Sequence, residues 1–338
     1  MKVIIEANIP FIHGILEPFA DIEYLTNDKI TADSVRDADA LIIRTRTICN
    51  AALLEGSKCQ FIGTATIGTD HIDLSYCHKR GIAVYNAPGC NAPAVAQYLF
   101  SSIAEWMQHD GRKSSELILG VIGVGNVGKI VARWGEALGF KLLLSDPPRE
   151  RNESEPITHI APLERLIAES DIITFHTPLT NQGEDATYHL CNTVMVDKFQ
   201  KSPLVINCAR GGITDTTALL GGLSNGKISA CVIDCWEDEP MINSTLLEKS
   251  LVTTPHIAGY SIEGKMRGTE IILKALKKHF DLKELEITEV TKPITGATTV
   301  TLEQITQSYN PLTDTAALKA SQTDFESLRN NYHYRHEV

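Results

Sequence analysis

Short runs of β-branched and aliphatic residues recur along the chain, and a segment compatible with a helix or loop follows each run. In the first ninety residues the apolar runs are Val3–Ile5, Leu41–Ile43, Phe61–Ile62 and Ala83–Tyr85. Continuously apolar strands that alternate with helices are typical of a parallel sheet, because helices then cover both of its faces. We therefore predict a first parallel sheet in this part of the chain.

A second series of strands begins after a long helix-compatible stretch, Ala92–Trp106, which has a proline in its first turn. Six runs separated by helical segments match the doubly wound nucleotide-binding plan. These runs are Ile118–Ile122, Lys141–Ser145, Ile172–Phe175, Leu204–Asn207, Ala230–Ile233 and Val252–Thr254. The expected fold class is α/β, with two doubly wound, Rossmann-like parallel sheets.

The expected division of the chain has three parts. A helical stretch, Glu263–Phe280, is long enough to return the chain to the first sheet. We therefore expect residues 1–93 and 257–285 to form one discontinuous, flavodoxin-like domain, and residues 94–256 to form a Rossmann domain. Residues 286–338 are Thr-rich and β-prone near Val290–Leu302 and polar afterwards, which indicates a small α+β appendage or assembly segment.

Charge and composition exclude several classes of partner. The formal net charge is −11, whereas nucleic acid or an anionic membrane requires a concentrated basic surface. No apolar run reaches the roughly 18 residues of a membrane span, and we interpret the N-terminus as a strand rather than a signal peptide. The eight cysteines form no CxxC pair, so we interpret them as reduced core thiols in a cytoplasmic protein without a metal site.

A glycine-rich turn directly follows the strand Ile118–Ile122 and opens a helix through Trp134. In the GxGxxG pattern the glycines allow a tight turn, a close approach of the backbone to a pyrophosphate, and packing of the helix on the strand. The residues that we assign to the cofactor in this turn are Gly123, Gly125, Asn126, Val127 and Gly128.

An acidic residue, Asp146, ends the next strand eighteen residues after Gly128. This is close to the spacing at which a carboxylate binds the adenosine ribose hydroxyls, and an acidic group there favours NAD over NADP. Arg149 lies nearby and is the residue that would bind a 2′-phosphate. The Asp-Pro-Pro turn before Arg149 favours a solvated side chain instead, so NAD is the expected cofactor.

Three polar residues follow later strands of the second series, at the edge where open α/β sheets bind ligands. They are Arg210 in Asn-Cys-Ala-Arg-Gly-Gly, Glu239 in Cys-Trp-Glu-Asp-Glu-Pro, and His256 in Thr-Pro-His-Ile-Ala-Gly. Oxidation of a hydroxy acid needs a base for the hydroxyl proton, a cation for the carboxylate and a nicotinamide that takes the hydride. These side chains supply the base and the cation, although each alone is also common as a cap or a surface residue.

These motifs resemble those of the D-isomer specific 2-hydroxyacid dehydrogenase family over about residues 1–285. Four longer segments carry a narrower resemblance: residues 61–73, 86–92, 174–179 and 256–268. The resemblance implies that His256 removes the hydroxyl proton, that Glu239 orients its ring, and that Arg210 binds the carboxylate. It further implies contacts with NAD from Thr177, Cys208, Ala209, Asp234 and Gly259. Asp234 has capping of its own loop as an alternative role.

Two loops of the first domain are candidates for binding a substrate. Residues 64–69 form a turn of small residues whose N–H groups suit a carboxylate. Residues 44–47, Arg-Thr-Arg-Thr, provide two cations and two hydroxyls for a phosphate on an acidic protein, with a solvated loop as the alternative. From these loops and the family resemblance we assign to the substrate Arg44, Thr45, Arg46, Thr66 and Tyr260; for Tyr260 a core aromatic is the alternative.

The expected activity is therefore the NAD-dependent oxidation of a small phosphorylated hydroxy acid. Two alternatives stay open: the same chemistry on another small acid, such as phosphoglycerate or glycerate, and an NAD-sensing binding protein on the same fold. The resemblance also implies a homodimer formed through the C-terminal segment, which is longer in the family than in this chain. Arg335 in that segment is a further candidate for a phosphate contact across the dimer.

Overall fold

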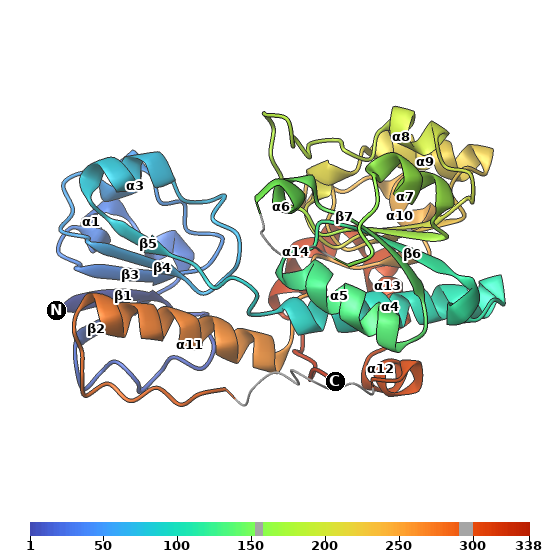
Figure 1. Ribbon diagram of the computed structural model, residues 1–338. Helices are drawn as coiled ribbons and strands as arrows, with labels where there is room; N and C mark the ends of the chain where they lie inside the picture. The colour runs from blue at the N-terminus through green and yellow to red at the C-terminus, as the bar shows by residue number, and fades with distance from the viewer. Residues whose placement is uncertain (153–157, 291–299) are drawn as a thin grey trace. The chain divides into compact units, whose positions relative to one another are not determined.

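The computed structural model describes residues 1–152, 158–290 and 300–338, and the chain divides into two compact units. The first unit combines Met1–Asn91 with Ser261–Pro293, and the second combines Ala92–Tyr260 with Ile294–Val338. Each unit contains one parallel sheet with helices packed against it (Figure 1). The predicted fold class, with two parallel α/β sheets, is confirmed.

The sheet of the first unit has the strand order β2-β1-β3-β4-β5, which is the flavodoxin-like order. Its strands are β1 (Lys2–Glu6), β2 (Asp21–Leu25), β3 (Ala40–Ile43), β4 (Phe61–Thr64) and β5 (Ala83–Tyr85). Four of them coincide with the predicted apolar runs. The pattern analysis missed β2, because this edge strand has the mixed sequence Asp-Ile-Glu-Tyr-Leu and is only half-buried.

A long helix, α11 (Ile262–His279), covers one face of this sheet and returns to it from the far end of the sequence. Its buried residues Ile272 and Leu276 share a core cluster with Phe61 of β4. The approach is close, because a Cβ atom added to Gly63 of β4 would lie 2.4 Å from Cγ2 of Ile272. The other helices of the unit are η1 (Asn27–Lys29), α1 (Ala32–Val35), α2 (Ala51–Leu54) and α3 (Leu74–Arg80).

The sheet of the second unit has the order β11-β10-β9-β8-β6-β7. Its strands are β6 (Ile118–Ile122), β7 (Lys141–Ser145), β8 (Ile172–Phe175), β9 (Leu204–Asn207), β10 (Ala230–Ile233) and β11 (Val252–Thr253), as predicted to within one residue. Ile160 adds a parallel bridge to Leu144 on the outer side of β7. If the strands are numbered from β6 along the chain, with this bridge as the third, their order across the sheet is 3-2-1-4-5-6, which is the Rossmann order, and β11 adds one more strand.

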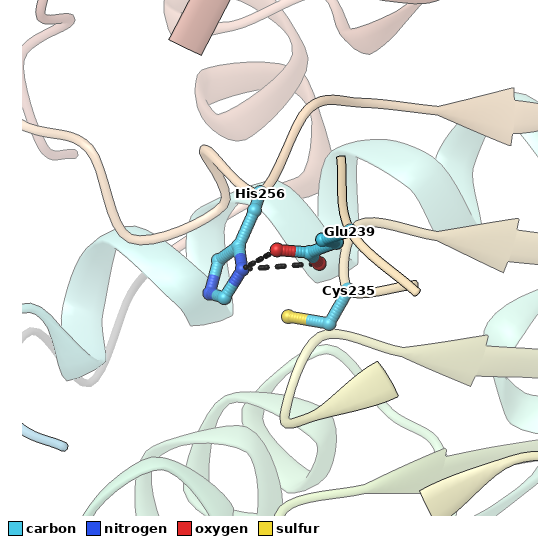
Figure 2. Close-up of side chains that lie close together, drawn as sticks. All are labelled: Cys235, Glu239 and His256. Carbon is cyan, nitrogen blue, oxygen red and sulfur yellow. Dashed lines mark hydrogen bonds and ion pairs between the residues drawn. The ribbon is translucent and has the colours of Figure 1, made fainter. Parts of the chain in front are cut away.

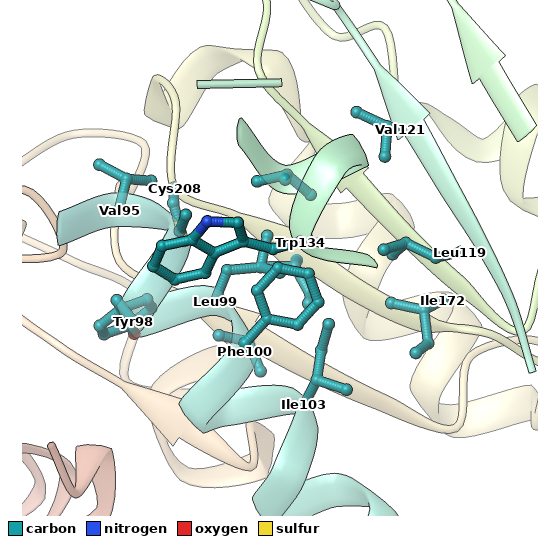
Figure 3. Packing of buried hydrophobic residues seen from close by; sticks show 14 of the residues in the cluster. Val95, Tyr98, Leu99, Phe100, Ile103, Leu119, Val121, Trp134, Ile172 and Cys208 are labelled. Carbon is teal, nitrogen blue, oxygen red and sulfur yellow. The ribbon is translucent and has the colours of Figure 1, made fainter. Parts of the chain in front are cut away.

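Two helices, α4 (Ala92–Asp110) and α5 (Asn126–Ala137), pack together on one face of this sheet (Figure 3). The ring centroids of Phe100 on α4 and Trp134 on α5 lie 6.2 Å apart. Both rings belong to a buried cluster with Leu119 and Ile172 of the strands, so the glycine turn before α5 rests on a packed core. The remaining helices before residue 260 are η2 (Ser114–Glu116), α6 (Pro147–Asn152), α7 (Leu163–Glu169), α8 (Thr193–Asp197), η3 (Gly211–Ile213), α9 (Thr216–Asn225) and α10 (Ser244–Lys249).

The regular elements of the C-terminal residues 300–338 are helices, and the expected strands of an α+β segment are not among them. They form α12 (Leu302–Ser308), α13 (Pro311–Ala320), η4 (Gln322–Asp324) and α14 (Phe325–Asn330). Leu318 and Phe325 are buried in a core cluster of the second unit, so this tail is a part of that unit and not a separate one. The predicted β-prone stretch falls largely on residues 291–299, outside the described residues. Among the described residues, no helix is both long enough and apolar enough to span a bilayer.

Candidate active site

The glycine turn between β6 and α5 has the geometry that its sequence predicts. Gly123 has a φ of +88°, and a Cβ atom there would lie 2.8 Å from the carbonyl carbon of His176. A Cβ atom on Gly128 would lie 2.0 Å from the carbonyl oxygen of Gly123. At Gly125 an added Cβ would meet no atom of the described part of the chain within 4 Å, so the backbone is open there to an approaching group. Gly125 is also the N-cap of α5 and has no side chain to cap the first N–H groups of the helix.

Asp146 at the end of β7 is fixed beside this turn. Its Oδ2 accepts a hydrogen bond of 2.7 Å from the N–H of Val124, and its Oδ1 accepts one of 3.2 Å from the N–H of Arg149. The expectation of a solvated Arg149 is wrong, because the side chain is partly buried and donates to the carbonyl oxygen of Val124. The carboxylate and the turn therefore form one hydrogen-bonded unit, as a site for an adenosine ribose requires.

The residues expected around the nicotinamide follow neighbouring strands of the same sheet. The Thr177 Oγ1 atom is buried and has no hydrogen-bond partner among the residues that the structure describes, and its Cγ2 atom lies beside Gly123. Cys208 and Ala209 follow β9, and the Ala209 N–H donates to Oδ1 of Asn207 at 3.1 Å. A buried hydroxyl without a partner beside an open glycine turn fits a polar ligand such as a dinucleotide.

Asp234 directly follows β10 and holds the loop that carries His256. Its carboxylate accepts hydrogen bonds from Thr254 Oγ1 at 2.6 Å, from the Ile257 N–H at 2.7 Å and from the Ala258 N–H at 3.0 Å. The side chain is buried, and burial raises the pKa of Asp234 above its ordinary value. The structure thus shows the loop-capping role that was left open for Asp234. Gly259 lies in the loop that this carboxylate holds, and contacts of both residues with NAD stay predictions.

Glu239 and His256 form a direct pair (Figure 2). The ring Nδ1 of His256 lies 2.9 Å from Oε2 and 3.2 Å from Oε1 of Glu239. Oε1 also accepts a hydrogen bond of 2.8 Å from the Trp236 N–H, which fixes the carboxylate. His256 itself has a φ of +58°, and its backbone N–H donates to the Asp234 carbonyl at 2.9 Å. Both side chains are therefore held in place from the backbone as well as by each other.

The charges around Glu239 keep it ionised. Burial alone would raise the pKa of Glu239, but the charge and hydrogen bond of His256, the Trp236 N–H and the charge of Arg329 outweigh burial and lower it. A carboxylate can only accept, so Nδ1 of His256 must carry a hydrogen. The other ring nitrogen, Nε2, is then the atom that can accept a proton from a ligand.

A thiol, Cys235, lies against this pair (Figure 2). Its Sγ atom, one carboxylate oxygen of Glu239 and one ring nitrogen of His256 lie within 4.8 Å of one another. Burial, followed by the nearby charges of Asp234 and Glu239, raises the pKa of Cys235 well above its ordinary value. The sulfur is therefore a protonated thiol and is unsuited to act as a nucleophile.

Arg210 is positioned by a turn that packs against the Glu239 loop. Its carbonyl oxygen accepts from Asn207 Nδ2 at 2.9 Å, and its Nη1 donates to the Ala209 carbonyl at 2.8 Å. A Cβ atom on the next residue, Gly211, would lie 1.8 Å from the carbonyl oxygen of Trp236. The structure thus brings the loops of all three predicted catalytic residues together at the carboxyl edge of one sheet.

The predicted substrate loops of the first unit follow the neighbouring strands β3 and β4. The Arg44 Nε donates to Oε1 of the fully buried Glu6 at 2.8 Å, and the Arg44 backbone N–H donates to Oε2 at 2.9 Å. Thr45 and Arg46 are exposed. In the next loop, the hydroxyls of Thr64 and Thr66 lie 2.7 Å apart. Arg44 therefore anchors its loop, and Thr45 and Arg46 are the members that face solvent.

The C-terminal tail changes one expectation and adds a residue to the site. Arg335 is only 9% exposed, and its guanidinium donates to the Gln97 side chain and to backbone carbonyls that include those of Ala258 and Tyr260. It braces the loop after His256 from inside the second unit, so the expected contact with a phosphate across a dimer is wrong for this conformation. The Tyr260 hydroxyl accepts a hydrogen bond of 3.3 Å from Nε of Arg329, a residue that sequence reasoning missed.

Residues 96–258 match the model of the D-isomer specific 2-hydroxyacid dehydrogenase, NAD binding domain. An erythronate-4-phosphate dehydrogenase of Bacteroides thetaiotaomicron is 46% identical over 342 residues, which cover all of this chain and 97% of that protein. One of Porphyromonas gingivalis is 40% identical and is matched over all of this chain and 94% of its own length. This chain belongs to the D-isomer specific 2-hydroxyacid dehydrogenase family.

Solved structures of the family share the fold of this member. A D-lactate dehydrogenase of Aquifex aeolicus, complexed with NAD and lactic acid, has a TM-score of 0.69 at 25% identity, covering 87% of this chain and all of its own. An NAD-bound 3-phosphoglycerate dehydrogenase of Entamoeba histolytica has a TM-score of 0.70 at 22% identity, covering 86% and 99%. The protein is thus an NAD-dependent oxidoreductase that acts on a CH–OH group, and NAD is the cofactor, as the glycine turn and Asp146 predict.

Proposed function

We propose that the protein oxidises 4-phospho-D-erythronate to (R)-3-hydroxy-2-oxo-4-phosphobutanoate with NAD, a step in pyridoxal 5′-phosphate biosynthesis. The observation that carries the proposal is the His256–Glu239 pair at 2.9 Å, held beside the Arg210 turn on the sheet that bears the glycine turn. Relatives of 40% to 46% identity along the whole chain, named erythronate-4-phosphate dehydrogenase, support the choice of substrate.

In the proposed mechanism, His256 is the general base. Its Nε2 accepts the proton of the C2 hydroxyl as the hydride leaves C2, and NAD, when bound, supplies the acceptor for that hydride. Glu239 stabilises the imidazolium that forms and holds the ring in the required tautomer. Arg210 binds the substrate carboxylate and polarises the developing carbonyl. In the reverse direction the imidazolium returns the proton.

We assign the phosphate of the substrate to the loop after β3. Arg46 and Thr45 are exposed there, whereas Arg44 is tied to the buried carboxylate of Glu6. Thr66 and Tyr260 are proposed to contact the rest of the substrate through their hydroxyls. A local cation is needed for a phosphate because the protein as a whole carries a net charge of −11 and offers no general attraction for an anion.

Arg46→Gln is expected to raise the KM for 4-phospho-D-erythronate by about 10-fold to 100-fold, because a charge-assisted hydrogen bond to the phosphate is lost. The KM for D-erythronate, which has no phosphate, should change by less than about 3-fold. Steady-state kinetics with both acids measure this difference. An equal rise in KM for the two acids would show that Arg46 does not bind the phosphate.

Arg44→Gln provides the comparison, because Arg44 pairs with a buried carboxylate. The change leaves Glu6 without its cation and should lower the free energy of unfolding by about 3 kcal/mol. Chemical denaturation of both variants measures this difference, and we expect a smaller loss in Arg46→Gln, because Arg46 is exposed whereas Arg44 pairs with a buried carboxylate.

The substrate itself is tested by comparing kcat/KM for 4-phospho-D-erythronate, 3-phospho-D-glycerate and D-glycerate with NAD. We expect the four-carbon phosphate to be the best substrate. Faster turnover of 3-phosphoglycerate would favour the alternative dehydrogenase, and tight NADH binding without turnover of any acid would favour a sensor.

We also propose that the protein is a homodimer in the cytoplasm. Sedimentation of the purified protein tests the oligomeric state.

A further inference from the structure

A cation from the C-terminal tail, Arg329 of α14, lies against the catalytic pair. Its Nη1 is 3.7 Å from Oε2 of Glu239, the oxygen that is closest to the His256 ring. We propose that Arg329 is a positioning residue that holds the Glu239 carboxylate for His256 and keeps His256 available as a base. This inference rests on the proposed function, because it concerns the same pair of side chains.

The position of Arg329 is fixed on two sides. Its side chain is 18% exposed, and Nε donates to the Tyr260 hydroxyl at 3.3 Å while Nη1 faces Glu239. The helix that carries Arg329 is itself anchored by Phe325, which is fully buried in a core cluster of the same unit, and by Leu328, which packs on that cluster. Arg329 is therefore held in the site by packing and hydrogen bonding, unlike a solvated arginine on the surface.

The charges around the pair explain why a cation matters here. Glu239 faces the His256 ring, the Trp236 N–H, the protonated Cys235 thiol and Arg329. The charge of His256 also acts on the buried Asp234. Without Arg329, Glu239 would lose one of the two positive charges that lower its pKa, and it would interact more strongly with a charged imidazolium. Arg329 adds a second positive charge beside the carboxylate, and this charge opposes the build-up of positive charge on the His256 ring.

The tail is also tied to the loop that follows His256. The Arg335 guanidinium lies 4.3 Å from the Tyr309 ring centroid and donates to the Tyr260 carbonyl at 3.1 Å. Residues 325–338 lie beyond the segment 96–258 that matches the family model for the NAD-binding domain. The tail thus contributes to the site from outside the segment that matches the family model: Arg329 lies at the pair, and Arg335 lies behind the loop.

The test compares Arg329→Gln, Arg329→Lys and the control Lys319→Gln in the full-length protein. Lys319 also ties the tail to the body of the unit, and it does so through the carbonyl oxygens of Glu248 and Ser250 rather than through the catalytic pair. The measurements are the pH profiles of kcat and kcat/KM for 4-phospho-D-erythronate oxidation, the thermal unfolding of each variant, and NMR titration of the His256 ring nitrogens, assigned with a His256→Asn spectrum.

For Arg329→Gln we expect kcat to fall about 10-fold, with less than a 3-fold change in KM. The acid limb of the profile, below which oxidation is lost, should move to higher pH by about half to one unit, as expected for one charge a few ångströms from the pair. Arg329→Lys retains the charge and should restore the limb, and Lys319→Gln should leave the profile unchanged.

Three outcomes would overturn the inference. A rise in KM at unchanged kcat would make Arg329 a substrate contact, and an unshifted acid limb in Arg329→Gln would leave it a purely structural residue. An equal loss in Arg329→Gln and Lys319→Gln would mean that only the attachment of the tail matters. If the wild type oxidises no hydroxy acid, the proposed function fails, but the NMR titration still measures the effect of Arg329 on the His256 ring.

Discussion

His256→Asn is expected to lower kcat for hydroxy acid oxidation by about 10²-fold to 10⁴-fold and to leave the Kd for NADH within about 3-fold of the wild type. The loss corresponds to about 3–5 kcal/mol of transition-state stabilisation, which is the usual contribution of a general base. Asparagine can still contact Glu239 but cannot take up a proton at the position of Nε2. Stopped-flow oxidation and NADH fluorescence titration measure the two quantities separately.

Cys235→Ala is the matched control for this change, because Cys235 lies within the same group of side chains but is expected to be a packing residue. Its kcat should stay within about 3-fold of the wild type, since the thiol is protonated and hydride transfer needs no nucleophile. A large loss in Cys235→Ala together with an active His256→Asn variant would reverse the two roles and reject the mechanism.

The sequence was most informative where function depends on local backbone geometry. The glycine turn after Ile122 was predictable because a GxGxxG pattern between a strand and a helix leaves few alternatives, and the strands β6 to β11 were predictable because buried parallel strands are continuously apolar. Glu239 and His256 were found because they follow strands of one sheet, and parallel strands bring their carboxyl ends to one edge.

Features that depend on contacts between distant segments were not predictable in this way. Arg329 lies 90 residues from Glu239 in the sequence, and its neighbours Leu-Arg-Asn-Asn indicate only an exposed helix end. Arg335 has the same local character, but the fold buries its guanidinium against the carbonyl oxygens of the loop after His256. Arg149 was expected in solvent because an Asp-Pro-Pro turn precedes it, and the carbonyl oxygen of Val124 that binds it lies 25 positions earlier in the sequence.

Gly128→Ala should have the second large effect, on both folding and cofactor binding. The new Cβ atom would lie 2.0 Å from the carbonyl oxygen of Gly123. This oxygen belongs to the backbone, so the clash cannot be relieved by the movement of a flexible side chain. The start of α5 must then shift from the turn, which we expect to lower the free energy of unfolding by about 3 kcal/mol or more and the Tm by about 6–12 °C. The Kd for NADH should rise at least about 100-fold, because the N–H groups that face the pyrophosphate move with the helix.

Gly125→Ala separates folding from binding at the same turn. Its Cβ atom would meet nothing within 4 Å, so the free energy of unfolding should change by less than about 1 kcal/mol. The added methyl group nevertheless occupies the open side of the turn where the backbone would approach the pyrophosphate, and we expect the Kd for NADH to rise about 10-fold to 100-fold. Thermal unfolding without ligand and NADH titration measure both effects. If Gly125→Ala binds NADH as tightly as the wild type, the pyrophosphate binds elsewhere. If Gly128→Ala has the Tm of the wild type, α5 does not pack on the turn as closely as the distance of 2.0 Å implies.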